Sequence, residues 1–377
     1  MVTEQQSETL LAYVKHLVAC DTRVGSGMLS KEEGIFAFLE DQLSGFELDF
    51  VAESDTTLGL LAMRGSRPKH LLCVHLETGQ EIRGWSHDPF TLRVQNGEVL
   101  GLGVANCKGG AGALLTALQD TSEDVAVLFT LDLKQYNNMC ASQFLASSLR
   151  SKLSTIEFVF CIEPTCGAVV TEHRGLVQCT GYFNGVSGHG AQARVLVDSA
   201  IHEAMRWGMR ALDFAGEHQR HTYYDSLKGI YFNIGLMEGG NNSNMIADHA
   251  VVKWTVRPLP EQEPMYVAKQ ICELASRPWR VRWEYQFNGP TLPARGSAEK
   301  TAEIIDRTRE YLSSYALLLG SAVDFWTPAS IFSQAGFLAA ALGPGHIAQS
   351  DAPDERVKLS ELEQSVCTFM RLIDGVK

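Results

Sequence analysis

Three short apolar runs constrain what this chain can fold into more than any other feature of its sequence. They cover residues 70–76, 125–132 and 158–162, and each is bounded by charged or turn residues. A helix-like segment, 111–118, lies between the first two. Runs of this kind are typical of strands buried on both faces of a largely parallel sheet. The sequence therefore predicts an α/β domain with helices flanking a mostly parallel sheet.

The pattern changes near residue 177. Residues 177–185 alternate like a half-exposed strand, a helix is expected at 198–211, and further strands are expected at 230–235 and 250–257. A stretch of this length with its own strands and helix favours a second, inserted α+β domain that is smaller than the first.

We therefore expect residues 177–289 to form the inserted domain, and residues 1–176 and 290–377 to form the α/β domain. In the α/β domain, apolar residues at helical spacing predict helices and a late apolar run predicts a strand that returns to the sheet. The helices are expected at 8–20, 31–43 and 298–319, and the strand at 337–342.

The charge of the chain excludes two classes of partner. Its formal net charge is -12 and it has no block of lysine or arginine, whereas nucleic acids and anionic membranes require clustered positive charge. No apolar run approaches the roughly 20 residues of a spanning helix, and the acidic start is unlike a secretion signal. The nine cysteines are scattered, which suits free thiols in a reducing cytoplasm. We expect a cytoplasmic protein whose partners are small molecules or proteins.

Polar residues collect where the predicted parallel strands end. His75 ends the first run, acidic residues occupy positions 132 and 163 at the ends of the other two, and Gly-Pro-Gly turns the chain at 343–345. The carboxyl ends of parallel strands meet in one crevice, which is the usual ligand site of an open α/β sheet. Nucleophile elbows, phosphate loops and paired glycosidase carboxylates are absent, and Gly101-x-Gly103 lacks the third glycine of a dinucleotide loop.

An ordered series of motifs along nearly the whole chain resembles the M20-type zinc aminoacylases, the family of the acetylornithine and acetylcitrulline deacetylases. The acetylcitrulline branch is the more similar, judged by the sequences at 204–208 and 324–327. The motifs lie at 74–77, 85–90, 101–110, 131–134, 163–165, 172–175, 188–189, 239–246, 257–260, 324–327 and 343–351. The resemblance implies a homodimer formed through the inserted domain.

The resemblance also implies where two zinc ions would bind, and this chain departs from that pattern. In the family, a His of the first motif and a Glu before Pro bind the first zinc, and an Asp of the glycine-rich motif bridges both ions. His75 and Glu163 match, but the bridging position is Asn106, a neutral amide that bridges two cations poorly. These three are vestigial metal positions, and a single zinc on them would have only two good ligands.

The second zinc and the general base lose their residues altogether. The base position is Leu133, which cannot accept a proton, and the adjacent ligand position is Lys134, whose ammonium would repel a metal. The late His position holds Asp351. Lys134 is therefore expected to replace the second metal electrostatically, with Asp351 and Glu163 around it. The alternative is an inert, salt-bridged pocket left by decay.

The residues that the resemblance assigns to substrate recognition are present. His189 would hold the oxyanion that develops on the substrate, and Asn244 and Arg257 would bind its polar groups, with Arg257 suited to a carboxylate. His173 and Arg174 are further candidates for substrate binding. Without the family, His189 reads as a structural loop histidine, Arg257 as a surface charge at a strand end, and His173-Arg174 as a solvated turn.

These residues lead to three functional hypotheses. The first is an enzyme that binds an N-acyl or similarly substituted amino acid of the ornithine or citrulline type and performs metal-independent amide chemistry with Lys134, His189, His75 and Asp351. The second is a pseudoenzyme that binds ligand or regulates an active paralogue. The third is a deacetylase that works with one metal ion. No cofactor is expected under the first.

Overall fold

The computed structural model describes residues 2–23, 34–53, 56–79, 84–131, 139–294 and 298–375. The chain forms two compact units. Unit 1 consists of Met1–Thr171, Ala298–Gly320 and Thr327–Lys377, and unit 2 consists of Glu172–Ser297 and Ser321–Trp326. The predicted domain boundaries at 177 and 289 remain a prediction. In the part of the chain that the structure describes, no helix is both long enough and apolar enough to cross a bilayer.

Unit 1 is built on a six-stranded sheet in the order β1-β2-β6-β3-β7-β16. Strands β6, β3, β7 and β16 are parallel to one another, and β1 and β2 extend the sheet as antiparallel strands. The strands are β1 (Glu47–Glu53), β2 (Thr56–Arg64), β3 (His70–His75), β6 (Val125–Thr130), β7 (Phe158–Ile162) and β16 (Leu338–Ala341). Because β6 and β7 are buried along their whole lengths, they read as continuous apolar runs.

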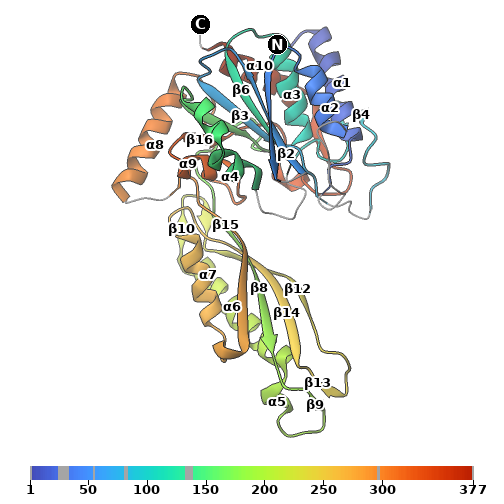
Figure 1. The fold of residues 1–377 in the computed structure, drawn as a ribbon, viewed down its shortest axis with the longest axis vertical. Helices are drawn as coiled ribbons and strands as arrows, with labels where there is room; N and C mark the ends of the chain where they lie inside the picture. The colour runs from blue at the N-terminus through green and yellow to red at the C-terminus, as the bar shows by residue number, and fades with distance from the viewer. Residues whose placement is uncertain are drawn as a thin grey trace. The chain divides into compact units, whose positions relative to one another are not determined.

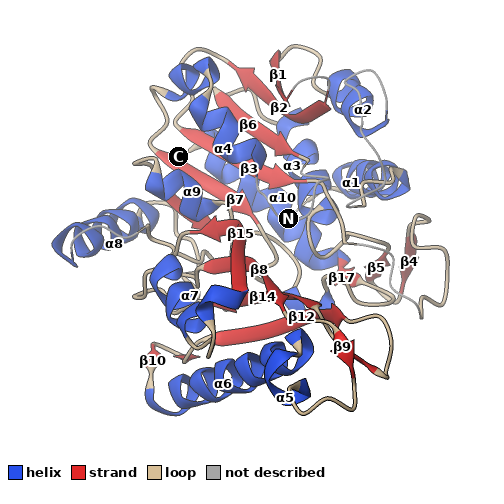
Figure 2. Cartoon of the chain, turned by 60° about the horizontal axis from the view of Figure 1, so that its bottom comes forward, coloured by secondary structure: helices blue, strands red, loops and turns tan. Residues whose placement is uncertain are grey.

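Helices cover both faces of this sheet (Figures 1 and 2). One layer forms the main core with the sheet and consists of α1 (Glu4–Ala19), α2 (Gly34–Gln42), α3 (Lys108–Gln119) and α10 (Leu359–Asp374). On the other face lie α4 (Met139–Ala146) and α9 (Ala329–Gln334), and α8 (Ala298–Ser313) packs on β16. A separate small sheet, β17-β5-β4, is formed by Arg356–Lys358, Glu98–Leu100 and Arg93–Gln95. Short 3-10 turns lie at Ser148–Leu153 and Ile347–Gln349.

Unit 2 is a four-stranded antiparallel sheet, β12-β14-β8-β15, with two helices on one face. Trp207 and Trp254 are buried between the sheet and α6. The strands are β8 (Leu176–Asn184), β12 (Tyr231–Gly239), β14 (His249–Arg257) and β15 (Val281–Gly289), and the helices are α6 (Ala200–His221) and α7 (Pro264–Glu273). Shorter elements are β9 (Gly188–His189), β13 (Met245–Ile246), α5 (Val195–Asp198), β10 (Tyr223–Tyr224), β11 (Leu227–Lys228) and a 3-10 turn at Pro278–Arg280.

The α/β fold with a mostly parallel sheet and a smaller α+β unit is confirmed, but several predicted bounds differ: the helix predicted at 198–211 continues to His221, and the strand predicted at 230–235 continues to Gly239. The helix predicted at 298–319 ends at Ser313. The hydroxyls of Ser313 and Ser314 donate to the carbonyl oxygens of Glu310 and Tyr311, and Ala316 has a φ of 49°. Serine side chains that bond to the preceding turn compete with helix continuation.

Candidate functional site

Strands β3 and β7 place His75 and Glu163 side by side at the carboxyl edge of the unit 1 sheet. Val74 pairs with Ile162 in the parallel register, so the residues that follow them are neighbours. The Nε2 atom of His75 lies 4.0 Å from Oε2 of Glu163, and its Nδ1 lies 3.4 Å from Oε1 of Glu77. All three side chains are less than one-fifth exposed. The edge therefore holds one imidazole between two carboxyl groups.

The charges of these three groups perturb each other strongly. Burial alone would lower the pKa of His75, but the negative charges of Glu77 and Glu163 outweigh burial and raise it to about 10. Burial raises the pKa of the Glu163 carboxyl to about 7 against the opposing charge of His75, with a smaller contribution from Glu77. The two neighbouring carboxyl groups therefore favour the protonated form of His75.

Glu355 holds the glycine-rich turn that carries Asn106. Its Oε1 accepts the backbone N–H groups of Ala105 at 2.8 Å and Asn106 at 2.9 Å, and its Oε2 accepts that of Gly103 at 2.9 Å. Burial raises the pKa of Glu355 to about 7 in spite of these three donors. Gly103 has a φ of 84°, and a Cβ there would come within 2.7 Å of the Thr78 side chain. The turn therefore requires glycine and a buried carboxyl group.

The remaining predicted residues of this edge are placed only in part. Asp351 is exposed, has a φ of 58° and accepts the backbone N–H of Gly79 at 3.2 Å. Leu133 and Lys134 lie outside the described residues. The pairing of Lys134 with Asp351 and Glu163 thus remains a prediction.

The donor set at this edge does not fit the two zinc ions that the resemblance implies. The described ranges contain no group of three or more His, Cys, Asp or Glu side chains placed to hold a metal ion. Among the vestigial positions, only His75 and Glu163 carry ordinary zinc ligands, because Asn106 offers a neutral amide.

His189 and Asn244 form a second group of predicted site residues, in unit 2. Strands β9 and β13 pair His189 with Met245, and the Nε2 atom of His189 lies 3.1 Å from Nδ2 of Asn244. The backbone N–H of Ala191 donates to Nδ1 of His189 at 3.2 Å. Because Nδ1 accepts, a neutral ring carries its proton on Nε2. Both side chains are exposed, so His189 presents an N–H donor that the Oδ1 of a rotated Asn244 amide can accept.

Arg257 is far from this pair within unit 2. Asn244 precedes strand β14, and Arg257 ends it. A strand of nine residues spans about 25 Å at roughly 3.3 Å per residue. The structure thus brings His189 and Asn244 together and places Arg257 at the opposite end of the strand.

The side chains of His173 and Arg174 are fully buried. His173 donates from Nδ1 to the carbonyl oxygen of Arg174 at 2.8 Å. The Arg174 guanidinium pairs with Asp324 at 2.7 Å, donates to the carbonyl oxygen of Gly229 and stacks on the Tyr231 ring at 4.1 Å. With these contacts inside unit 2, we expect both residues to support the sheet rather than touch a ligand. The solvated turn considered from sequence is wrong, because neither side chain reaches solvent.

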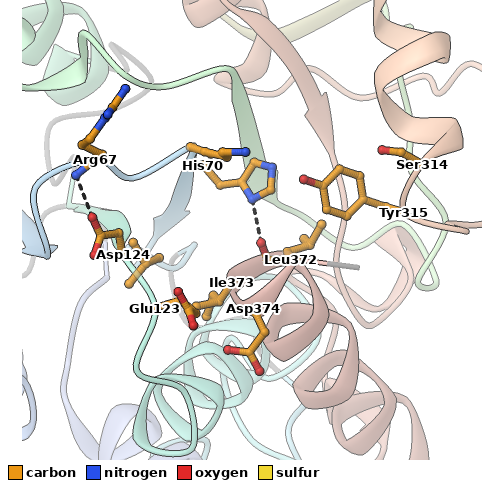
Figure 3. A pocket seen from close by; sticks show the side chains of 12 residues that line it. Arg67, His70, Glu123, Asp124, Ser314, Tyr315, Leu372, Ile373 and Asp374 are labelled. Atoms are coloured by element: carbon orange, nitrogen blue, oxygen red, sulfur yellow. Dashed lines mark hydrogen bonds between the residues drawn. The ribbon is translucent and has the colours of Figure 1, made fainter. Parts of the chain in front are cut away.

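A cavity of about 630 Å³ lies at the opposite edge of the unit 1 sheet, where β3 and β6 begin (Figure 3). His70 lines it, but Nδ1 lies 2.7 Å from the Leu372 carbonyl oxygen and Nε2 lies 2.8 Å from the Tyr311 hydroxyl. Burial lowers the pKa of His70, so the ring is neutral. None of the predicted site residues lines this cavity. The described site residues that we predict for unit 1 therefore lie at the carboxyl edge and not at this cavity.

Glu77 and Glu355 are the two residues that sequence reasoning missed. Glu77 had a local signal, because it follows His75 at a spacing of two just beyond the end of a strand. Glu355 had none, since the backbone groups that it binds are about 250 residues earlier in the chain.

Comparison with known sequences extends over nearly the whole chain. Residues 171–280 match the M20 peptidase dimerisation domain. The chain is 37% identical over 365 residues to the N-acetyl-L-citrulline deacetylase of Xanthomonas campestris pv. campestris, covering 97% of each protein. It is 28% identical over 346 residues to the acetylornithine deacetylase of Photorhabdus laumondii subsp. laumondii, covering 88% of this chain and 86% of that one.

Solved structures share the fold at low sequence identity. Human carnosine dipeptidase 1 superposes with a TM-score of 0.69 at 11% identity, covering 98% of this chain and 97% of that one. The M20 family metallo-carboxypeptidase Sso-CP2 from Sulfolobus solfataricus superposes with a TM-score of 0.68 at 13% identity, covering 98% and 99%. At this level of identity the likeness extends to the fold alone.

Proposed function

Because this chain belongs to the M20 family, alongside relatives named as deacetylases of N-acetylcitrulline and acetylornithine, we propose that it acts on an N-acyl or similarly substituted amino acid of the citrulline or ornithine type. The reaction is amide chemistry without a two-zinc centre, either acyl transfer, lysis or hydrolysis. The comparisons show the family and the likeness to deacetylases, and we propose that the reaction itself uses no zinc.

The buried cluster of His75, Glu77 and Glu163 carries this proposal. Its own imidazolium supplies positive charge between two carboxyl groups, where the family places a metal ion. The chemistry of the substituted positions supports it, since Asn106 cannot bridge two cations and Lys134 repels them. If such a pocket held no metal, its carboxylates would lack a counter-ion. The ammonium of Lys134 supplies one and offsets the free-energy cost of their burial.

The proposed roles follow from the chemistry of each side chain. Lys134 is the fixed cation of the pocket and, when partly desolvated, its proton shuttle, with Asp351 as a counter-ion. His189 donates its Nε2 proton in a hydrogen bond to the developing oxyanion. Asn244 and Arg257 bind the polar groups of the substrate, Arg257 at a carboxylate.

We further propose that a second copy of the chain completes the recognition set. His189 and Arg257 lie at opposite ends of strand β14, about 25 Å apart at roughly 3.3 Å per residue, which exceeds the size of one amino-acid substrate. The apolar residues Met205, Met209 and Leu212 are at least 50% exposed on one face of α6. On the neighbouring edge strand β12, Leu236 and Met237 are also exposed. An apolar face beside an unpaired edge strand suits a symmetric dimer.

Metal content and turnover measured on one preparation test the proposal. We expect fewer than one zinc per chain by plasma mass spectrometry. We also expect N-acetylcitrulline or N-acetylornithine to bind in calorimetry with an affinity that a chelator does not change, and a converted product by mass spectrometry. Lys134→Met should abolish conversion, whereas Lys69→Met, at an exposed lysine on the opposite edge of the sheet, should not.

The outcomes separate this proposal from its alternatives. Two zinc ions per chain would overturn it. Tight binding with no turnover, unchanged by Lys134→Met, identifies a ligand-binding pseudoenzyme or a regulatory partner. Conversion that a chelator abolishes and zinc or cobalt restores identifies a single-metal deacetylase.

A further inference from the structure

The segment that carries His189 has little regular structure of its own. Between the end of β8 at Asn184 and the start of α6 at Ala200, it contains only the two residues of β9 and the four residues of α5. A short strand and a single helical turn do not define a side-chain position without further contacts. The tertiary contacts of residues 185–199 therefore decide where His189 lies.

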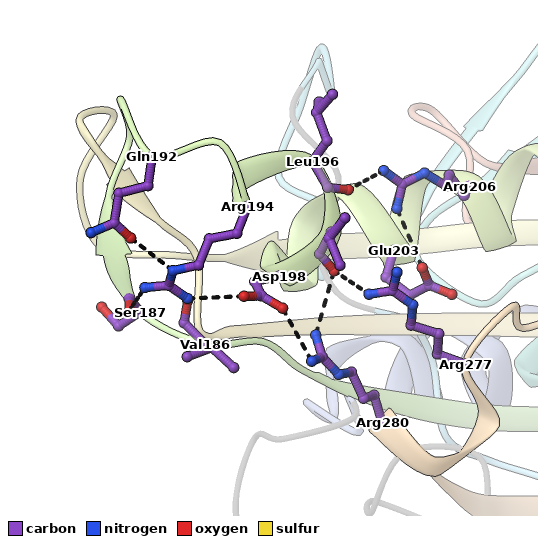
Figure 4. A network of polar contacts seen from close by, with 11 residues as sticks. Val186, Ser187, Gln192, Arg194, Leu196, Asp198, Glu203, Arg206, Arg277 and Arg280 are labelled. Atoms are coloured by element: carbon purple, nitrogen blue, oxygen red, sulfur yellow. Dashed lines mark hydrogen bonds and ion pairs between the residues drawn. The ribbon is translucent and has the colours of Figure 1, made fainter.

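Besides the pairing of β9 with β13, Arg194 makes four hydrogen bonds to other residues of this segment (Figure 4). Its guanidinium donates to the carbonyl oxygens of Val186 at 3.2 Å and Ser187 at 2.7 Å, the residues just before β9. It also donates to the side chain of Gln192 at 2.7 Å, on the other side of His189. One planar group thus joins the two sides of the loop, and this geometry needs the fork of arginine.

Asp198 and Arg280 hold Arg194 in place (Figure 4). The carboxylate of Asp198 accepts from Arg194 at 2.9 Å and from Arg280 at 3.1 Å, so Asp198 bridges the two guanidinium groups. Hydrogen bonds from Arg194, together with those from Arg280, lower the pKa of Asp198. Arg280 lies beside β15, so the bridge connects the loop to the sheet of unit 2.

Gly188, directly before His189, is matched to this arrangement. A Cβ at Gly188 would lie 2.2 Å from Nη2 of Arg194 and 2.7 Å from the Gln192 side-chain oxygen. Any larger residue would displace the guanidinium from the loop. The close approach of the guanidinium to the backbone therefore depends on both residues, Arg194 and Gly188.

We infer that Arg194, Asp198 and Arg280 are positioning residues that keep the proton of the neutral His189 ring on Nε2. The brace they form aligns the backbone of residues 189–192, so that the Ala191 N–H reaches Nδ1 and excludes the other tautomer. The inference rests on the proposed role of His189 and extends it to residues that touch no substrate.

Nitrogen-15 NMR of the histidine rings tests the brace without any substrate. Comparison with His189→Gln identifies the ring signals of His189 among those of the 11 histidines. Above neutral pH we expect the wild type to show a bare Nδ1 and a protonated Nε2. In Arg194→Met and Asp198→Asn these signals should move toward a mixture of tautomers, with Arg194→Lys intermediate. Arg206→Met is the matched control, because Arg206 belongs to the same network but bonds Glu203 and the Leu196 carbonyl.

The steady-state kinetics of the variants are the second measurement. In folded Asp198→Asn protein, confirmed by circular dichroism, kcat should fall on the order of tenfold with KM little changed, as expected for a displaced transition-state donor. Wild-type ring signals in folded Arg194→Met and Asp198→Asn proteins would overturn the inference. If the signals change but the wild type binds no N-acyl amino acid, the brace stands and the proposed function fails.

Discussion

The acidic side chains of the two units differ in their burial and in the direction of their pKa shifts. In unit 1 the acidic groups of the site are buried, and burial raises the pKa values of Glu163 and Glu355 to about 7. In unit 2 the comparable acid, Asp198, is partly exposed between two arginines, and its pKa is lowered. Burial in unit 1 therefore favours the protonated forms of Glu163 and Glu355, whereas the two guanidinium groups in unit 2 favour the ionised form of Asp198.

The substitutions away from the family pattern follow the same division. The changed positions, Asn106, Leu133, Lys134 and Asp351, all lie in unit 1 or in its sequence range. The recognition residues His189, Asn244 and Arg257 belong to unit 2. The departures from the family's metal positions are therefore confined to the range of unit 1, and the residues that we propose for the oxyanion and the substrate's polar groups belong to unit 2.

The largest expected effect comes from reversing the changes in unit 1. A variant with Asn106→Asp, Leu133→Glu, Lys134→Glu and Asp351→His regains the zinc ligands that the family resemblance implies. We expect it to bind about two zinc ions per chain, because a bridging carboxylate and a second imidazole complete both coordination shells. Plasma mass spectrometry after dialysis against zinc measures the content.

A matched variant separates ligand chemistry from loss of charge. Leu133→Gln, Lys134→Gln and Asp351→Asn remove the same charges but add no zinc ligand, and this protein should bind no more zinc than the wild type. Equal zinc content in the reverted and the matched variants would contradict our interpretation of unit 1.

Glu355 should make the stability of unit 1 depend on pH. Its folded-state pKa of about 7 lies above the ordinary value of 4.5, so the folded state holds the proton more tightly. The resulting stabilisation is fully present below about pH 4.5 and is lost as the pH rises through about 7, which amounts to about 3 kcal/mol at roughly 1.4 kcal/mol per pKa unit. Urea unfolding at several pH values measures this slope, which should be smaller in Glu355→Gln than in the wild type, because Glu163 still contributes to it.

Glu284 in unit 2 provides the contrast. It is exposed and paired with Arg282 at 2.8 Å, so Glu284→Gln should leave the pH dependence of unfolding unchanged. Parallel curves for wild type and Glu355→Gln would count against a proton held at Glu355.

The smallest expected effect concerns the outer face of unit 2. Met209 on α6 is 61% exposed, and Met209→Glu should weaken the proposed dimer on the order of tenfold by placing a charge in an apolar interface. Tyr266→Glu on α7 changes a residue with 62% exposure outside the proposed interface and should have no effect. Sedimentation equilibrium measures both, and a wild type that is monomeric at high concentration would remove the dimer from the proposal.

Much of the fold was predictable because its signals are local. Strand β7 was predicted at its observed bounds, since five consecutive apolar residues fill a strand buried on both faces. Strand β15 was not predicted, although apolar and polar residues alternate regularly along it from Val281 to Asn288. The end of α8 depends on serine hydroxyls and a left-handed alanine, which a hydrophobic pattern does not register.

The site was predictable only where the chain itself places the residue. His75 and Glu163 end neighbouring parallel strands, so their proximity follows from the topology. The contact of Glu355 with Gly103 joins residues 252 positions apart and requires the finished fold. The tautomer of His189 depends on a single backbone N–H, which no residue pattern encodes.

The pairing of Arg174 with Asp324 limits how this molecule can be divided. Residues 321–326 return to unit 2 after the chain has left it, and they bring the carboxylate that neutralises a guanidinium with no exposure to water. A fragment excised at residue 297 would keep the cation and lose its counter-ion. An isolated unit 2 for biophysical work would therefore need residues 321–326 joined to residue 297 through an artificial linker.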